Sequence, residues 1–244
     1  MKQYHYYQKK MTNFTKTNLF SCPIYKIRID PKLYDKEKIL NDILYNKSLK
    51  TIRNETHQSL SKPSCAPHDI HHSHRDFNNE NFRSINYEKL VSIYSVILDN
   101  FFNKEIKTIK DFQFKFEIVN YVAMTEGQHL PSHFHTPCDF STIHYLNFKD
   151  DHELTCFENP ADFAPYMRYL QPELVNILAR DEPDNSYAFT NYDIPAEEDD
   201  FIIFPSIVSH LIYPQEPTKE SRITVSTNIK IADEDGEARM DTEY

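Results

Sequence analysis

The sequence has 244 residues, enough for one large domain or two small ones with a substantial hydrophobic core. Only two glycines occur, Gly127 and Gly236, so the sequence can contain neither a GxGxxG motif nor a P-loop for nucleotide phosphates. The net charge of −10 argues against sequence-independent binding of nucleic acid, which requires a basic face. We interpret the acidity as a solubility feature of a globular protein.

The cysteines and the absence of targeting segments predict the location of the protein. The four cysteines (Cys22, Cys65, Cys138 and Cys156) form no CxxC pair and no dense disulfide framework. The sequence shows no signal peptide and no transmembrane run. We therefore expect a reduced, cytoplasmic protein. Cys138 lies close to a pair of histidines and could be a thiolate ligand, although a small residue on a strand or turn is the simpler interpretation.

The N-terminal half is predicted to hold one strand and two helices. Residues 1–17 are expected to form a loose extension, and residues 20–29 read as a first strand. Apolar residues recur near helical spacing over residues 32–45. They do so again over residues 86–103, which form an amphipathic helix that should pack on a sheet.

The polar segment between these helices, residues 48–84, is rich in histidine. One interpretation is a second metal site around the His-His-Ser-His sequence at residues 71–74. The simpler interpretation is an exposed loop with scattered histidines, because no partner ligands flank the cluster at fixed spacing. We prefer the exposed loop. The histidines concerned are His57, His68, His71, His72 and His74.

The C-terminal half reads as a series of β-strands. Residues 112–122 alternate between apolar and polar side chains until Val119 places an apolar residue on the polar face. The next strand, residues 141–148, is predicted to place Ile143 and Tyr145 on one face. Further strands are predicted at residues 200–204, 211–213 and 222–231, with a polar hairpin connection at residues 214–220.

Residues 149–196 interrupt this series of strands and contain a candidate helix at residues 166–179. A long insertion between core strands is uncommon without a role, and a functional lid is one usual explanation. An elaboration without a catalytic part is the other, and the sequence leaves both open. The acidic tail, residues 232–244, is expected to be disordered. We therefore expect a single domain over residues 18–231.

Two histidines placed two residues apart suggest a metal site. His133 and His135 would point to the same face of an extended strand, because the side chains of a strand repeat with a period of two. Neutral imidazole is a good ligand for Fe, Zn, Cu and Ni. His210 follows the apolar strand at residues 201–204 and Pro205, and it is the best candidate for a third ligand. Together the three could hold one metal ion.

Arg222 opens the last predicted strand and shares a face with Thr224 and Ser226. The planar guanidinium group can pair with both oxygens of a carboxylate. A buried arginine beside a metal would therefore be a natural clamp for a carboxylate ligand. Alternatively, Arg222 forms a surface salt bridge with Glu216 or Glu220.

The residues described above resemble a hydroxylase branch of the Fe(II)/2-oxoglutarate-dependent oxygenases. The resemblance covers about residues 18–231, and its specific motifs lie within residues 112–231. The order and spacing of the motifs, rather than any single motif, carry the resemblance. The matching residues are an opening segment at residues 19–25, then Tyr121, Gly127, His133-Phe134-His135-Thr136-Pro137, Tyr145-Leu146-Asn147, Phe204-Pro205-Ser206, His210, Arg222 and Asn228.

The resemblance implies a mainly β fold with packed helices (α+β), whose core is a double-stranded β-helix, a cupin-like jelly-roll. It also implies that Fe(II), 2-oxoglutarate and O₂ are used to hydroxylate a small-molecule or peptide substrate, with release of succinate and CO₂. Arg222 would pair with the distal carboxylate of 2-oxoglutarate. Tyr145 would reach the same carboxylate through its phenol, and Thr224 could add a hydroxyl group.

The sequence departs from this family in its metal ligands. The family usually presents two histidines and one carboxylate, but His135 occupies the position of the carboxylate. We prefer a site with three histidine ligands. Alternatively, Asp139 swings in as a ligand and His135 supports it from outside the coordination shell. In a third interpretation an anion replaces the carboxylate, as in the related halogenases.

Two other functions are compatible with the sequence. A cupin-like enzyme with three histidine ligands could oxidise a substrate without 2-oxoglutarate, and it would not need the dicarboxylate clamp of Arg222 and Tyr145. A non-enzymatic barrel that binds a ligand or partner would keep its activity after metal removal. The substrate and the oligomeric state stay open, because aromatic residues in the N-terminal half would suit a homodimer interface and a core equally well.

Overall fold

The computed structural model describes residues 22–49, 71–72, 80–106, 112–160, 176–179, 182, 185 and 189–232. The predicted N-terminal extension and nearly all of the predicted tail lie outside these residues. The same holds for most of the histidine-rich segment and for the greater part of the helix predicted at residues 166–179. His71 and His72 are the two histidines of the rich segment whose backbone is described.

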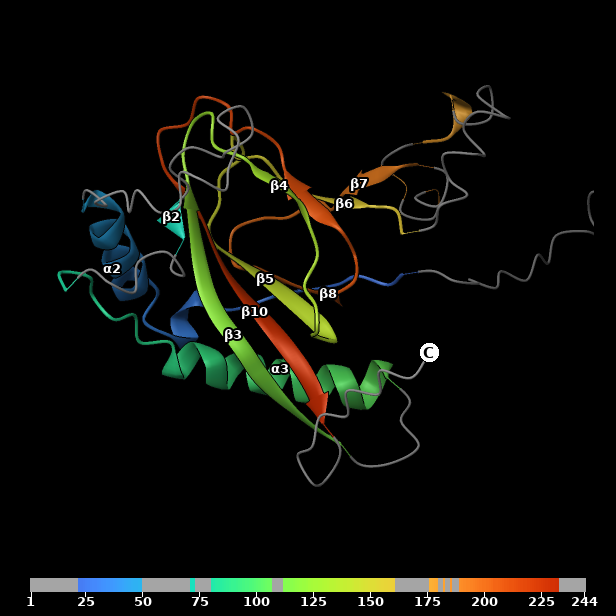
Figure 1. Ribbon diagram of the computed structural model, residues 1–244, viewed down its shortest axis with the longest axis horizontal. Coiled ribbons are helices and arrows are strands. Elements are labelled where there is room, and N and C mark those ends of the chain that lie inside the picture. Colours follow the sequence, from blue (N-terminus) through green and yellow to red (C-terminus); the bar gives the residue numbers. More distant parts are fainter. Residues whose placement is uncertain are drawn as a thin grey trace, which may run out of the picture.

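The described part of the chain forms ten β-strands and the helices α2 (Lys36–Ser48) and α3 (Glu88–Glu105) (Figure 1). A short 3-10 turn at Pro31–Leu33 precedes α2. Every predicted strand has a counterpart, with ends shifted by a few residues. The strands are β1 (Tyr25–Arg28), β2 (His71–His72), β3 (Gln113–Met124), β4 (Leu130–His133), β5 (Phe140–Asn147), β6 (Thr155–Glu158), β7 (Asn191–Asp193), β8 (Asp200–Pro205), β9 (His210–Ile212) and β10 (Arg222–Ala232).

The strands form two antiparallel sheets. The larger has the order β1-β8-β5-β10-β3-β2, and the smaller has the order β4-β9-β6-β7. From β3 onward the chain passes back and forth between them: β3, β5, β8 and β10 belong to the large sheet, and β4, β6, β7 and β9 to the small one. This interleaving is a double-stranded β-helix. The predicted mainly β fold with packed helices is confirmed.

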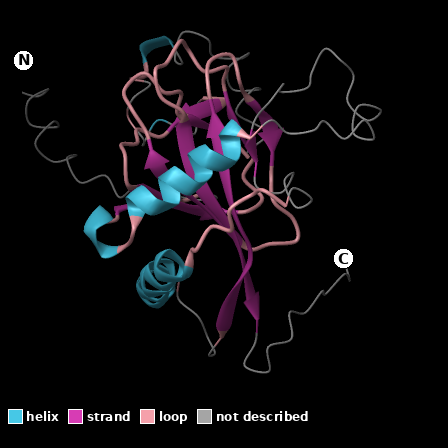
Figure 2. Cartoon of the chain, turned by 90° about the vertical axis from the view of Figure 1, so that its left-hand side faces the viewer, coloured by secondary structure: helices cyan, strands magenta, loops and turns pink. Residues whose placement is uncertain are grey.

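Helices α2 and α3 cover the outer face of the large sheet, as Figures 1 and 2 show. The apolar residues of α3 recur every three or four positions and form one buried stripe that includes Leu90, Tyr94 and Leu98. The ring of Tyr94 stacks on Phe201 of β8 with 4.6 Å between the ring centroids. Among the described residues, no helix combines the length and the apolar content needed to cross a bilayer.

The inner face of the large sheet packs against the small sheet. Ile143 and Tyr145 of β5 belong to this inner core together with Phe204 of β8 and Phe157 of β6. Leu146, the neighbour of Tyr145, belongs instead to the core beneath the helices. The predicted assignment of Ile143 and Tyr145 to one face is therefore confirmed.

A β-bulge in β3 explains why Val119 breaks the predicted alternation. Asn228 of β10 pairs with Ile118, whereas the next residue, Ile229, pairs with Phe116, so β3 holds one extra residue at this point. An extra residue exchanges the two faces of the strand beyond it. After the bulge, Val119, Tyr121 and Ala123 pack on the helix side, and Asn120 and Val122 face the space between the sheets.

Two strands occur where the sequence pattern predicts an interruption. Strands β6 and β7 both lie within residues 149–196 and form part of the small sheet. The connection at residues 214–220, predicted as a hairpin, instead joins β9 of the small sheet to β10 of the large one. The hairpin prediction was wrong because β9 and β10, although consecutive in the chain, lie in different sheets.

His144 of β5 is buried beneath the helices, with no exposed surface. The hydroxyl group of Tyr94 lies 2.8 Å from its Nδ1 atom, and its Nε2 atom is buried without a hydrogen-bond partner in the described part of the chain. Burial lowers the pKa of His144 from 6.5 to about 3, and the positive charge of Lys36 adds to this effect against the opposing charge of Asp200.

Acid is expected to destabilise the fold through His144. The unfolded chain binds a proton at this residue near pH 6.5, but the folded chain keeps the imidazole neutral down to about pH 3. The stabilising effect is complete above pH 6.5 and is lost progressively as the pH falls below it. The free energy of unfolding should drop by about 1.4 kcal/mol from this residue between about pH 7.5 and about pH 5.5. Urea unfolding of the wild type and of His144→Leu at both pH values measures this difference in the free energy of unfolding. An equal pH dependence of the two proteins would contradict the low pKa of His144.

Candidate metal centre and adjoining cavity

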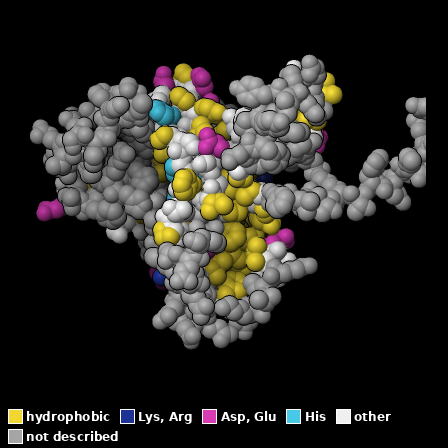
Figure 3. Space-filling model, turned by 45° about the vertical axis from the view of Figure 1, so that its right-hand side comes forward, with side chains coloured by type: hydrophobic (Ala, Val, Ile, Leu, Met, Phe, Trp, Pro, Cys, Tyr) yellow, Lys and Arg dark blue, Asp and Glu magenta, His cyan; other side chains and the backbone are white. Residues whose placement is uncertain are grey.

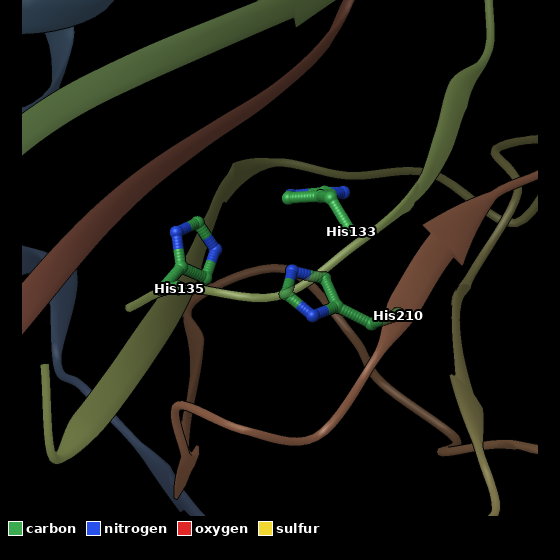
Figure 4. A group of neighbouring side chains, drawn as sticks. All are labelled: His133, His135 and His210. Carbon is green, nitrogen blue, oxygen red and sulfur yellow. The ribbon is translucent and has the colours of Figure 1, made fainter. Parts of the chain in front are cut away.

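Three histidines converge beside the paired strands β4 and β9 (Figure 4). His133 is the last residue of β4 and His210 is the first residue of β9, and the two are paired across the small sheet. His135 lies in the loop beyond β4 rather than on the strand. Its backbone N–H donates to the carbonyl oxygen of Ser206 at 2.9 Å, which keeps it beside the other two histidines.

The three rings are close enough to share one ion. The ring centroids of His133 and His210 are 4.3 Å apart, and His135 lies 5.1 Å from His133 and 5.2 Å from His210. One nitrogen atom from each ring can be chosen so that all three lie within 4.8 Å of one another. The structure therefore brings together the three residues that the sequence suggested as ligands.

Backbone hydrogen bonds orient two of the rings. The Nδ1 atom of His133 lies 2.8 Å from the carbonyl oxygen of Pro131, and that of His210 lies 3.1 Å from the carbonyl oxygen of Val208. A carbonyl oxygen can only accept, so each Nδ1 must carry a proton and each Nε2 must carry a lone pair. This tautomer presents Nε2 to a metal, as in many histidine-ligated centres.

The rings of His135 and His210 are also held in the neutral form that binds metals. Burial, together with the charge of His133, lowers the pKa of His210 to about 3 and that of His135 to about 4. At neutral pH each of these two imidazoles is therefore uncharged and keeps a lone pair on one of its ring nitrogens.

Asp139 and Cys138, the alternative ligands suggested by the sequence, are not in the histidine group. The carboxylate of Asp139 instead accepts a hydrogen bond of 2.7 Å from the backbone N–H of Ile231. Its role in this arrangement is to anchor the end of β10.

Replacing Asp139 by asparagine is expected to leave iron affinity within about threefold of the wild type, because the amide oxygen can still accept from Ile231. A chelator competition with Fe(II) measures the affinity. If Asp139 were a ligand instead, replacing its charged carboxylate by a neutral amide should weaken iron binding by roughly tenfold or more, which corresponds to a loss of at least about 1.4 kcal/mol of binding free energy.

A cavity of about 370 Å³ lies between the two sheets and reaches the histidines. Small-molecule sites in proteins typically have volumes of this order. Both sheets contribute to its wall, with the largest share from β10. The lining residues are Asn120, Val122, Leu130, His133, His135, Thr142, Ile143, Thr155, Phe204, His210, Ile212, Arg222, Thr224, Ser226 and Asn228.

Arg222 lines this cavity and is completely buried. Its Nε donates to the carbonyl oxygen of Glu153 at 2.9 Å, and its Nη2 donates to Oγ1 of Thr155 at 3.0 Å. Its Nη1 is buried without an acceptor in the described part of the chain. The surface salt bridge with Glu216 or Glu220 considered from the sequence is therefore absent among these residues.

Thr155 links Arg222 to Tyr145. The phenol of Tyr145 donates to Oγ1 of Thr155 at 2.8 Å, and Arg222 donates to the same oxygen. An oxygen that accepts two hydrogen bonds keeps its own proton for a third partner. The sequence patterns did not single out Thr155, because it lies in the short strand β6. Tyr145 itself is buried and does not line the cavity, whereas Thr224 lines it directly.

The lining of the cavity favours an anion. Arg222 is the one arginine or lysine among the described lining residues, and no carboxylate is among them. On the face seen in Figure 3, the described side chains include a continuous group of hydrophobic residues and a few histidine and acidic side chains.

The sequence matches one protein family. Residues 119–228 match the model of the family described as "Putative 2OG-Fe(II) oxygenase", where 2OG stands for 2-oxoglutarate. The matched segment runs from β3 to β10 and includes His133, His135, His210 and Arg222. No curated protein matches the sequence.

Several solved structures are similar to the chain at a low level. One is an oxidoreductase of the 2OG-Fe(II) oxygenase family from Burkholderia pseudomallei (11% identity, 61% of each chain covered, TM-score 0.40), so the match spans less than two thirds of that protein. Another is a prolyl-4-hydroxylase from Pseudomonas putida (9% identity, 86% of this chain and 93% of that chain, TM-score 0.45). A third is HygX from Streptomyces hygroscopicus with nickel and 2-oxoglutarate bound (11% identity, 86% and 83%, TM-score 0.43). Similarity at this level carries no argument about function.

Proposed function

We propose that this chain, whose residues 119–228 match the 2OG-Fe(II) oxygenase family, binds iron through His133, His135 and His210 and binds 2-oxoglutarate through Arg222. The two sets of residues line one cavity, as a ligand that spans the metal and a carboxylate clamp requires. Three neutral imidazoles form a donor set that suits Fe(II).

The observation that carries this proposal is the buried guanidinium group of Arg222. A charge removed from water without an anionic partner costs several kcal/mol. The Nη1 atom of Arg222 is buried and lacks an acceptor in the described part of the chain, and no lining residue is a carboxylate. The distal carboxylate of 2-oxoglutarate would supply both the missing charge and the missing acceptor. A cupin-like oxidase that does not use 2-oxoglutarate would have no need of such a group.

Two hydroxyl groups complete the proposed clamp. Thr155 accepts from both Arg222 and Tyr145, so its own proton is available for a carboxylate oxygen in the cavity. Thr224, which is 3% exposed and lines the cavity, adds a second hydroxyl group. In this proposal Tyr145 acts through Thr155 and fixes its orientation, rather than touching the carboxylate as the resemblance implies.

When bound, iron and 2-oxoglutarate supply the oxidising chemistry, which releases succinate and CO₂. The residues of the chain orient these groups and exclude water. The rings of Phe204 and Phe157 lie 5.0 Å and 5.8 Å from the ring of His210 and cover one side of the metal centre. An apolar wall there keeps water away from the reacting atoms.

The enzyme is proposed to hydroxylate a small-molecule or peptide substrate. Two exposed apolar residues lie next to the metal centre and support a substrate with an apolar part. Phe134, between His133 and His135, is 56% exposed, and Ile207, which follows Ser206, is 67% exposed.

The cytoplasmic location and a homodimer also belong to the proposal. The sequence supports this location, because its four cysteines form no CxxC pair and no dense disulfide framework. Light scattering of the purified protein measures the mass directly, and a value close to the 29.0 kDa of one chain would contradict the dimer.

The function is tested by adding Fe(II) and then 2-oxoglutarate to the purified protein without oxygen. Chelation of iron by the keto acid is expected to give a weak visible charge-transfer band. The band should be absent from His210→Ala. Iron binding without the band would favour the three-histidine oxidase, and no iron binding would favour a barrel that binds a ligand or partner without metal.

A further inference from the structure

A hydrogen-bonded chain of three buried polar side chains contacts the Nδ1 atom of His135. The Nδ2 atom of Asn228, on β10, lies 3.4 Å from Nδ1 of His135. The Oδ1 atom of Asn228 accepts from the hydroxyl group of Ser141 at 3.1 Å, and this hydroxyl lies 2.8 Å from that of Ser206. Asn228, Ser141 and Ser206 are 7%, 1% and 0% exposed. Ser206 also receives the backbone N–H of His135, so the chain closes on the residue where it starts.

His135 depends on this chain in a way that the other two histidines do not. The Nδ1 atoms of His133 and His210 face backbone carbonyl oxygens, which fix the tautomer that offers Nε2. The Nδ1 atom of His135 faces the side chain of Asn228, whose amide can present either its oxygen or its nitrogen. The tautomer of His135 is therefore set by which way this amide points.

The donors and acceptors of this hydrogen-bonded chain can be arranged in two opposite directions. With the nitrogen of Asn228 facing His135, the amide donates to Nδ1, and the proton of the neutral ring lies on Nε2, which cannot then bind a metal. With the amide turned by half a revolution, its oxygen accepts from Nδ1–H, and Nε2 is free. The amide nitrogen then donates to Ser141, which donates in turn to Ser206. Only the second direction suits a metal ligand.

We infer that Asn228 is a positioning residue that selects the metal-binding tautomer of His135 through the orientation of its side-chain amide. The inference rests on the proposed function, because it takes His135 to be a ligand. It also explains why the third ligand can sit in a loop: three buried side chains from β5, β10 and the loop after β8 hold its ring. Asn228 shares its strand and its cavity-facing side with Arg222, so one strand supports both the metal and the carboxylate clamp.

The test compares two replacements of Asn228 in the full chain loaded with Co(II). In Asn228→Asp the carboxylate can only accept, so the binding tautomer is fixed and Co(II) affinity should equal or exceed that of the wild type. In Asn228→Leu, of similar size, no acceptor is left, and Co(II) should bind about 10- to 100-fold more weakly, the usual effect of losing a partner behind a ligand. Competition with a chromogenic chelator measures the affinities.

A matched control removes a different buried hydrogen bond between the same two strands. Thr227, next to Asn228, bonds to Thr142 at 2.7 Å and does not line the cavity. Thr227→Val should therefore leave Co(II) affinity within about threefold of the wild type, because the lost bond does not reach a metal ligand. If a variant of Asn228 fails to fold, Ser141→Ala removes the next link of the chain and should weaken Co(II) binding by a few fold.

Proton NMR of the Co(II) protein gives a readout that a purely structural role would not move. Each ligated ring should show one shifted, exchangeable N–H resonance. In Asn228→Leu the resonance of His135 should be lost or exchange much faster, and in Asn228→Asp it should persist. Wild-type affinity together with all three resonances in Asn228→Leu would overturn the inference, as would equal weakening by Asp and Leu. Failure of the wild type to bind Co(II) would instead overturn the proposed metal site itself.

Discussion

Replacing His210 by alanine is expected to abolish iron binding. His210 is the most buried of the three histidines. Without it the ion would retain two ligands, His133 at the end of β4 and His135 in the loop that follows. A four-ligand zinc site contributes about 10–16 kcal/mol, so one ligand is worth roughly 2.5–4 kcal/mol and its loss should weaken binding by about a hundredfold or more. Competition of the protein with a chelator for Fe(II), without oxygen, measures the change.

His152→Ala is a suitable control for the removal of a buried histidine. His152 is 6% exposed, and its ring bonds to Thr218 and to the backbone oxygen of Glu220. It does not line the cavity, so its replacement should alter stability but leave iron affinity unchanged. Equal iron affinity in the wild type and His210→Ala would show that the metal lies elsewhere.

The sequence predicted the long strands of the large sheet because their alternation is visible over many residues. The strand that begins at Arg222 places Arg222, Thr224 and Ser226 on one side, and all three line the cavity. The short strands β6 and β7 were missed. They have four and three residues, too few for a clear period of two, and they flank a proline-rich stretch. With β6, the clamp residue Thr155 was missed as well.

The local geometry of the metal centre was beyond the sequence for a similar reason. The spacing of His133 and His135 suggested two ligands on one strand, but the strand ends at His133. The position of His135 depends on contacts with Ser206 and Asn228, which are 71 and 93 residues away along the chain. Likewise the bulge in β3 depends on pairing with β10. Spacing along the sequence identified the ligand candidates, and pairing between distant strands gives them their positions.

Replacing Arg222 by methionine is expected to weaken 2-oxoglutarate binding by about thirtyfold or more while leaving iron affinity unchanged. Truncating one partner of a buried charged pair typically costs about 2–5 kcal/mol. Methionine keeps much of the side-chain volume, and it removes a fully buried charge whose Nη1 lacks a hydrogen-bond partner in the described part of the chain. Stability without ligand should therefore be maintained or increased. Titration of the Fe(II) protein with 2-oxoglutarate, followed by the visible charge-transfer band, measures the affinity.

The control for this experiment is Arg83→Met. Arg83 forms a salt bridge with Asp42, in which its Nη1 lies 3.1 Å from the carboxylate. Its guanidinium group lies 3.8 Å above the ring of Tyr45. Its side chain is half exposed and lies outside the cavity, so its replacement should not affect 2-oxoglutarate. If Arg222→Met bound 2-oxoglutarate as tightly as the wild type, Arg222 would not be the group that binds the distal carboxylate. The unpaired Nη1 of Arg222 would then have to serve the substrate, and the three-histidine centre would be left without its proposed co-substrate.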